Sequence, residues 1–137
     1  MNINDDLKEI IIKEIDYVLE SMANSQTVIE KLYYFSGVAG IVNKVFNIEY
    51  DSDLVFAHFI LTSVHQNFNQ RIESIRRGDV IELKEEQINK LSEYLKELKE
   101  NFQEDNNIHG TLKKFTVLLY SVTGNGYYLM KKGMLNF

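Results

Sequence analysis

Hydrophobic residues recur along most of the chain at the three- and four-residue steps of an amphipathic helix. The first stripe begins at Leu7 and ends at Met22, with steps of 4, 4, 3 and 4, and similar stripes begin at Val28, Ile88 and Ile108. No segment sustains the strict alternation of apolar and polar residues that a half-buried strand requires. The pattern predicts helices near residues 5–22, 26–46, 53–77, 84–104 and 108–123.

The residues between these stripes are suited to ending one helix and starting the next. The chain contains no proline, so its turns must be made by glycine, asparagine and aspartate. Asp51 and Asp53 supply N-cap residues before the third predicted helix, and Gly78 follows two arginines at its end. Short connections between such helices indicate antiparallel neighbours. We therefore predict an all-α fold, an antiparallel helical bundle of four to five helices, formed by residues 1–137 as one domain.

The C-terminal segment begins with a strong turn signal, Gly124-Asn125-Gly126. The pairs Tyr127-Tyr128 and Lys131-Lys132 follow it. The pattern leaves open whether this tail is a further helix over 127–135 or an extended arm.

The third and fourth predicted helices differ in the width of their apolar faces. From Leu54 to Leu61 only His58 is polar, so this part of the third helix must be covered on all sides. It is therefore either central in the fold or covered by a second copy of the chain. The fourth helix has a stripe of only two apolar positions in seven, which places it on the outside, held by a narrow seam.

The composition is that of a soluble globular protein large enough to bury a core without disulfides or a structural metal. Of 137 residues, 45% are hydrophobic and 26% charged, and none is cysteine. Asp5 and Asp6 lie where a signal peptide would carry basic residues. The longest apolar stretch, residues 54–64, is too short to span a bilayer. We expect a cytoplasmic protein that does not insert into membranes.

Charge is distributed unevenly along this acidic chain, whose net charge is −5. Residues 106–137 contain four lysines and no acid, whereas residues 1–105 carry a balance of −9. An acidic body repels phosphate, which argues against general nucleic-acid binding. The basic end is expected to pack against the protein's own acidic surface, with a contact to an anionic partner as the alternative.

The residues with most chemical potential form a polar strip on the third predicted helix. His58 and His65 fall on its apolar seam, and Thr62, Asn69 and Arg76 lie on the neighbouring stripe. Two histidines seven residues apart are about 10 Å from each other, too far to share one metal ion. No cofactor or metal is therefore predicted. Each histidine either hydrogen-bonds across the bundle and fixes its register or lines a ligand pocket between helices.

Two glycines and a tyrosine are candidates for the opposite wall of such a pocket. Gly37 and Gly40 lie on one side of the second predicted helix, where glycine costs about 1 kcal/mol relative to alanine. They allow close packing of a neighbour or a ligand against bare backbone. Tyr127, in the C-terminal segment, is the other candidate.

No catalytic motif is present, which favours a role in association, as a homo-oligomer or a module for a protein partner. The alternative is a small-molecule or anion-binding protein, or an enzyme, with a site inside the bundle. Its ligand residues would be His58, His65, Asn69 and Arg76, with Arg76 holding an anion and His65 exchanging a proton.

Overall fold

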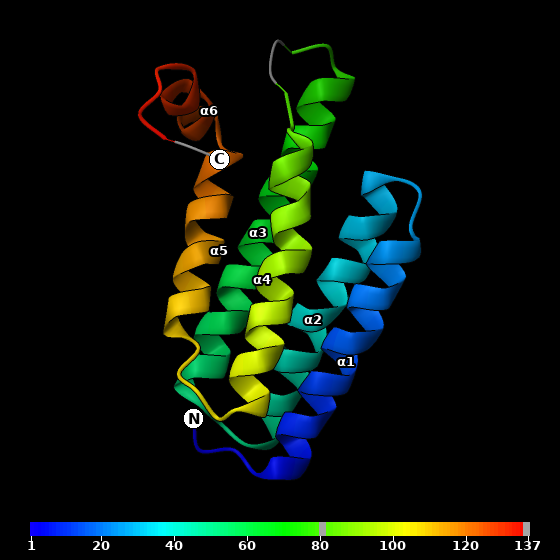
Figure 1. The fold of residues 1–137 in the computed structure, drawn as a ribbon, viewed down its shortest axis with the longest axis vertical. Coiled ribbons are helices and arrows are strands. Elements are labelled where there is room, and N and C mark those ends of the chain that lie inside the picture. The colour runs from blue at the N-terminus through cyan, green and yellow to red at the C-terminus, as the bar shows by residue number, and fades with distance from the viewer. Residues whose placement is uncertain (80–81, 136–137) are drawn as a thin grey trace.

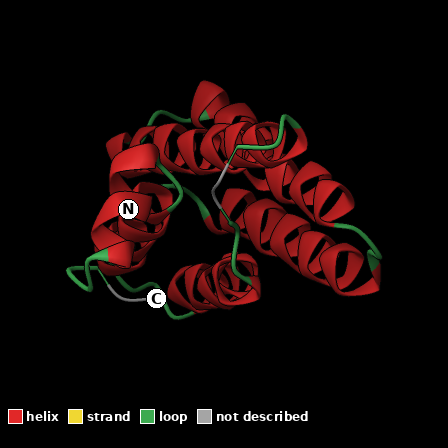
Figure 2. Cartoon of the chain, turned by 90° about the horizontal axis from the view of Figure 1, so that it is seen from above, coloured by secondary structure: helices red, strands yellow, loops and turns green. Residues whose placement is uncertain are grey.

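A computed structural model describes residues 1–79 and 82–135, and in this part of the chain helices are joined by short loops, with no strand (Figures 1 and 2). The predicted all-α class is confirmed. The described residues form six helices, one or two more than predicted. They are α1 (Asp5–Asn24), α2 (Val28–Ile48), α3 (Ser52–Arg76), α4 (Glu85–Gln103), α5 (His109–Ser121) and α6 (Gly124–Lys131).

Side-chain caps begin the first three helices. Asn4 accepts a hydrogen bond from the backbone N–H of Leu7, and Thr27 does the same for Glu30. Asp51 accepts from two backbone N–H groups at the start of α3, as the sequence predicts. These caps satisfy N–H groups that have no partner inside the helix. Gly78, at φ +86°, follows the C-terminus of α3 in the left-handed conformation that glycine adopts without strain.

The five longer helices form a closed ring around one hydrophobic core. In the ring, α1 packs against α2, α2 against α3, α3 against α5, α5 against α4, and α4 against α1. Successive helices in the chain run in opposite directions along the long axis (Figure 1). Chain order and ring order differ at one point, because α5 lies between α3 and α4. The neighbours α3 and α5 therefore run parallel to each other. The sequence predicted only antiparallel neighbours.

The buried stripe of α3 coincides with the predicted seam at every second position, from Leu54 to Phe68, and differs from it at the positions between. At those positions the predicted seam contained His58 and His65, whereas Ala57 and Val64 face the core without exposure. The same stripe continues to Arg71, which is buried, with only 3% of the residue exposed. The two histidines are half-buried at the edge of the stripe. Steps of three and four both fit a helix, so the spacing alone did not decide between the two registers.

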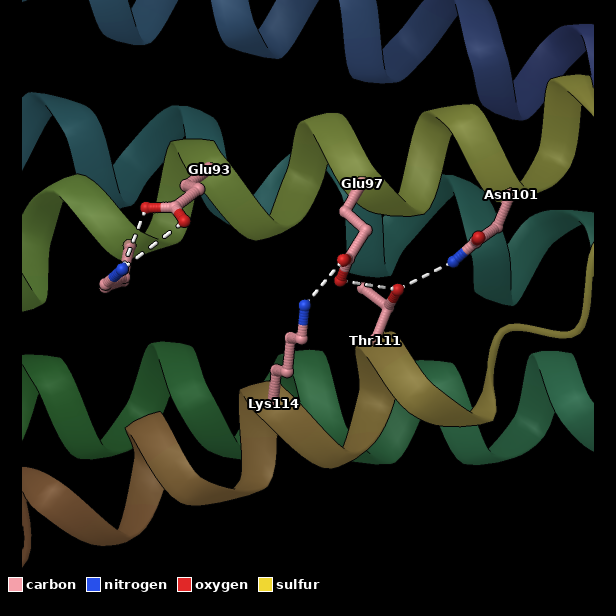
Figure 3. Close-up of polar contacts among 6 residues, drawn as sticks. Glu93, Glu97, Asn101, Thr111 and Lys114 are labelled. Carbon is pink, nitrogen blue, oxygen red and sulfur yellow. Dashed lines mark hydrogen bonds and ion pairs between the residues drawn. The ribbon is translucent and has the colours of Figure 1, made fainter.

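A polar network fixes α4 on α5 (Figure 3). The buried Thr111 hydroxyl accepts a hydrogen bond from the Asn101 amide at 2.6 Å and donates one to Glu97 at 2.8 Å. The other carboxylate oxygen of Glu97 accepts from the Lys114 ammonium at 2.6 Å. This hydrogen bond lowers the pKa of Glu97. Beside the network, α4 buries the narrow seam that the sequence predicts.

The junction of α3, α5 and α6 is organised by Arg71. Its guanidinium donates to the backbone carbonyls of Glu82, Val122 and Thr123 at 2.6–2.9 Å, and it lies 5.3 Å from the ring centre of Tyr127. Two of these carbonyls follow the last residue of α5, close to the negative end of the helix dipole, which favours a cation. A side chain of α3 thus stabilises the end of α5.

The sixth helix starts at the glycines that the sequence assigned to a turn. The Thr123 hydroxyl accepts from the backbone N–H of Gly126 and caps α6. A Cβ atom at Gly126 would overlap the backbone of Tyr120, so only glycine allows α6 to lie this close to α5. The tail is therefore a further helix that begins and ends earlier than the predicted 127–135. Residues 136 and 137 of the tail lie outside the described residues.

Candidate functional site

His58 lies in the seam between α3 and α2. Its Nδ1 donates to the backbone carbonyl of Ala39 at 3.1 Å, and its ring packs edge-to-face on Phe46 of α2. A carbonyl can only accept, so this contact assigns the proton to Nδ1. The cross-helix bond to a backbone group is one of the two arrangements that the sequence allows for this residue.

His65, Thr62 and Asn69 lie further along the same side of α3. The Asn69 amide donates to Nε2 of His65 at 3.3 Å, whereas the hydroxyl of the half-buried Thr62 forms no hydrogen bond with the residues described. Burial lowers the pKa of His65, which favours its neutral form. Five clefts of the described part of the chain have neither His58 nor His65 in their lining.

Arg76 is exposed at the end of α3 and is separated from the histidines. It pairs with Glu73 at 3.2 Å, one turn earlier on the same helix. It also lines an aliphatic cleft of about 340 Å³, formed by the end of α3 and the starts of α2 and α4. The ligand-binding role of Arg76 stays a prediction, because nothing in the geometry brings an anion to it.

The remaining predicted residues point in three other directions. Gly37 faces α1, where an added Cβ would lie 3.2 Å from a carboxylate oxygen of Glu14. Gly40 faces open space. Tyr127 contacts Arg71 at the α5–α6 junction. The eight predicted residues therefore do not converge on one cavity, and binding of a ligand by any of them stays a prediction.

The outward side of α3 has the properties of a contact surface. Phe56 and Phe59 are 60% and 63% exposed, although they are only three residues apart on one face of the helix. Val55, Ile60 and Ser63 lie around them and are partly exposed, and Gln66 continues the same face. We call these six residues the outer face of α3. The segment 54–61 is thus half core and half surface, rather than wholly central.

A groove adjoins the outer face of α3 where α3 meets α5. Phe56 and Ile60 form one wall, and Leu112 and Thr116 form the other, around a volume of about 380 Å³. At its end, His109 of α5 lies 2.7 Å from a carboxylate oxygen of Asp53. An apolar centre with polar residues at its margin is the arrangement found at protein interfaces.

Charge is absent from the part of α3 that carries this face. From Leu54 to Gln70, 17 residues contain no aspartate, glutamate, lysine or arginine. Exposed apolar residues are common when single, but a pair of adjacent phenylalanines on an uncharged helix face is a different case. The sequence signal for this surface was the apolar run itself, and only the packing of α3 against its neighbours separates the buried side of the run from its exposed side.

Comparison of the chain with protein families, curated proteins and solved structures finds no match. Over residues 1–79 and 82–135, no helix combines the length and the apolar character needed to cross a bilayer. In the same residues, no three histidine, aspartate or glutamate side chains gather as metal ligands would.

Proposed function

We propose that the protein is an antiparallel helical bundle that acts by associating with a second copy of itself. The outer face of α3 is the contact surface in this proposal. The observation that carries this proposal is the exposed pair Phe56 and Phe59 on a helix face without charge. Burying both rings removes a large apolar area from water, at roughly 25 cal/mol per Å².

A second copy suits this face better than a charged partner does. In a two-fold interface the same patch meets itself, so like charges on the patch would face each other and repel. The outer face of α3 avoids that repulsion because it has no formal charge. The groove between α3 and α5 lies beside it and supplies a recess into which a phenylalanine of the second copy can insert.

Sedimentation velocity on the purified chain tests the proposal. From about 1 to about 100 μM, a range that covers weak and moderate interfaces, we expect a concentration-dependent shift from monomer to dimer. The double variant Phe56→Glu/Phe59→Glu should remain monomeric throughout. Tyr128→Glu, which adds a charge at an exposed aromatic of α6, is the control and should associate like the wild type.

The dependence on salt separates this contact from one made by charge pairs. Each copy carries a net charge of −5, so added salt screens the repulsion between copies and should strengthen the dimer. An interface of opposite charges would weaken instead. A wild type that stays monomeric at the highest concentration, at both low and high salt, would exclude self-association and leave a different protein as the partner of this face.

A further inference from the structure

A separate cleft lies on the other side of the molecule's helix ring, between α1 and α2. It has a volume of about 230 Å³. Its lining residues are Glu14 and Tyr17 of α1 and Tyr33, Tyr34, Ser36 and Gly37 of α2. Half of these residues are tyrosines, and one is a carboxylate. The α1–α2 cleft shares no residue with the outer face of α3.

The rings of Tyr17 and Tyr33 each stand nearly at right angles to the half-buried ring of Tyr34. Its centre lies 6.3 Å from that of Tyr17, with an angle of 79° between the planes, and 5.3 Å from that of Tyr33, with an angle of 73°. Tyr17 and Tyr33 are 58% and 70% exposed. Aromatic faces carry partial negative charge, so three rings that line one cleft offer it positions that favour a cation.

Glu14 adds a formal negative charge to the same cleft. Within the described residues, its carboxylate has no ion pair and no hydrogen bond with another side chain. Gly37 provides the space for it, because a Cβ there would lie 3.2 Å from the Glu14 carboxylate oxygen. The glycine that costs stability inside α2 thereby has a use.

The protein's own cations do not occupy this cleft, although they stack on tyrosines elsewhere. Arg71 and Lys131 lie over Tyr127, and Lys132 lies over Tyr128, at 5.0–5.3 Å from the ring centres. Among the described residues, no lysine or arginine lies over Tyr17, Tyr33 or Tyr34. The cleft therefore has the aromatic and carboxylate groups of a cation site with no internal cation.

We infer that the α1–α2 cleft binds an alkylated ammonium group, held by the faces of the three tyrosines and by the charge of Glu14. Recognition of quaternary ammonium by several aromatic rings is a known use of the cation–π interaction. A primary ammonium is compact and strongly hydrated, so removing its water in so open a cleft costs more than removing the water around methyl groups. The cation is carried either by a small molecule or by a methylated lysine side chain.

Titration by NMR with choline chloride tests the inference, with 3,3-dimethylbutan-1-ol as the uncharged molecule of the same shape. We expect choline to shift the resonances of Tyr17, Tyr33 and Tyr34 in a saturable way, and the alcohol to shift them far less. Tyr17→Leu, Tyr33→Leu and Glu14→Gln should each weaken choline binding about twofold to fivefold. Tyr50→Leu, at an exposed tyrosine outside the cleft, should leave it unchanged.

The source of the cation is identified by a second titration. Tighter binding of a trimethyllysine peptide than of choline assigns the cleft to a protein side chain, and the reverse order assigns it to a small molecule. The inference is overturned if the alcohol shifts the rings as much as choline does. It is also overturned if choline shows no saturation below about 10 mM, or if Tyr17→Leu and Glu14→Gln bind choline like the wild type. Circular dichroism checks that the variants remain folded.

Discussion

The third and fourth helices bury similar stripes of apolar residues but present opposite surfaces to solvent. Helix α4 exposes Glu85, Glu86, Glu93, Lys96 and Glu100, a surface that water solvates well. Helix α3 exposes two phenylalanines on a stretch of 17 uncharged residues. Both helices serve the same core, so the core does not explain the difference. The self-association proposed above would explain the exposed side of α3, because it places this side in a contact outside the monomer.

The inner sides of the two helices differ as well. Helix α3 buries a cation that binds backbone carbonyls, whereas α4 is held by a network of side chains at the margin of the core. Mutations on each side therefore test the comparison separately.

The largest effect is expected for Arg71→Met. The substitution keeps much of the side-chain volume but leaves three backbone carbonyls without their charged donor, which should cost about 3 kcal/mol of unfolding free energy. Urea denaturation measures this loss. Arg77→Met, at an exposed arginine after the end of α3, should change stability by less than about 0.5 kcal/mol. Equal effects of the two substitutions would show that the Arg71 contacts do not stabilise the fold.

A smaller loss is expected for Thr111→Val on the α4 side. Valine has the same shape as threonine but neither accepts from Asn101 nor donates to Glu97, so about 1 kcal/mol of unfolding free energy should be lost. Thermal unfolding provides the measurement. Thr116→Val, at an exposed threonine of the same helix, is the matched control, and its melting temperature should stay near that of the wild type.

One added negative charge on each outer surface compares the helices directly. Gln66→Glu places the charge on the outer face of α3, and Asn89→Asp places it on the exposed side of α4. The first should raise the dissociation constant of the dimer about threefold to tenfold, because two such charges approach each other across a two-fold interface. The second should leave it unchanged. If both weaken the dimer equally, the contact surface is not the outer face of α3.

The smallest effect is a dependence on pH through Glu97. Its hydrogen bond with Lys114 lowers its pKa below the usual 4.5, so the bond stabilises the fold above pH 4.5 and is lost as the pH falls through the lowered pKa. Glu97→Gln should therefore be less stable at neutral pH and lose less stability between neutral pH and that lower pKa. Melting temperatures across this range provide the check, with Glu100→Gln, at an exposed glutamate of α4, as the control.

The sequence predicted most of the helical fold because each helix carries its own evidence. The stripe of α4, the Asp51 cap and Gly78 are local signals, and the structure confirms them. The parallel contact between α3 and α5 depends on how the ring closes, which no local pattern records. The start of α6 is likewise not recorded in a local pattern, because it depends on the close approach of Gly126 to the backbone of Tyr120.

The sites were harder to predict than the helices. Arg71 was not among the predicted site residues, although it continues the stripe of Ala57 and Val64 at helical spacing. A seam drawn through these two residues, in place of the two histidines, would have placed Arg71 in the core. Tyr17, Tyr33 and Glu14 gave no signal, because each is ordinary on its own and only the packing of α1 on α2 brings them together.

The hydrogen-bond acceptors of Arg71 affect the order in which parts of the molecule unfold in acid. Peptide carbonyls do not take up protons at ordinary acidic pH, and a guanidinium does not lose its proton. The hydrogen bonds between Arg71 and the backbone carbonyls therefore persist on acidification. The hydrogen bonds that the Glu97 carboxylate makes between α4 and α5 are sensitive to acidification. As the pH falls, amide hydrogen exchange should therefore show that α4 loses its protection first. The amides at the junction of α3, α5 and α6 should remain protected longest.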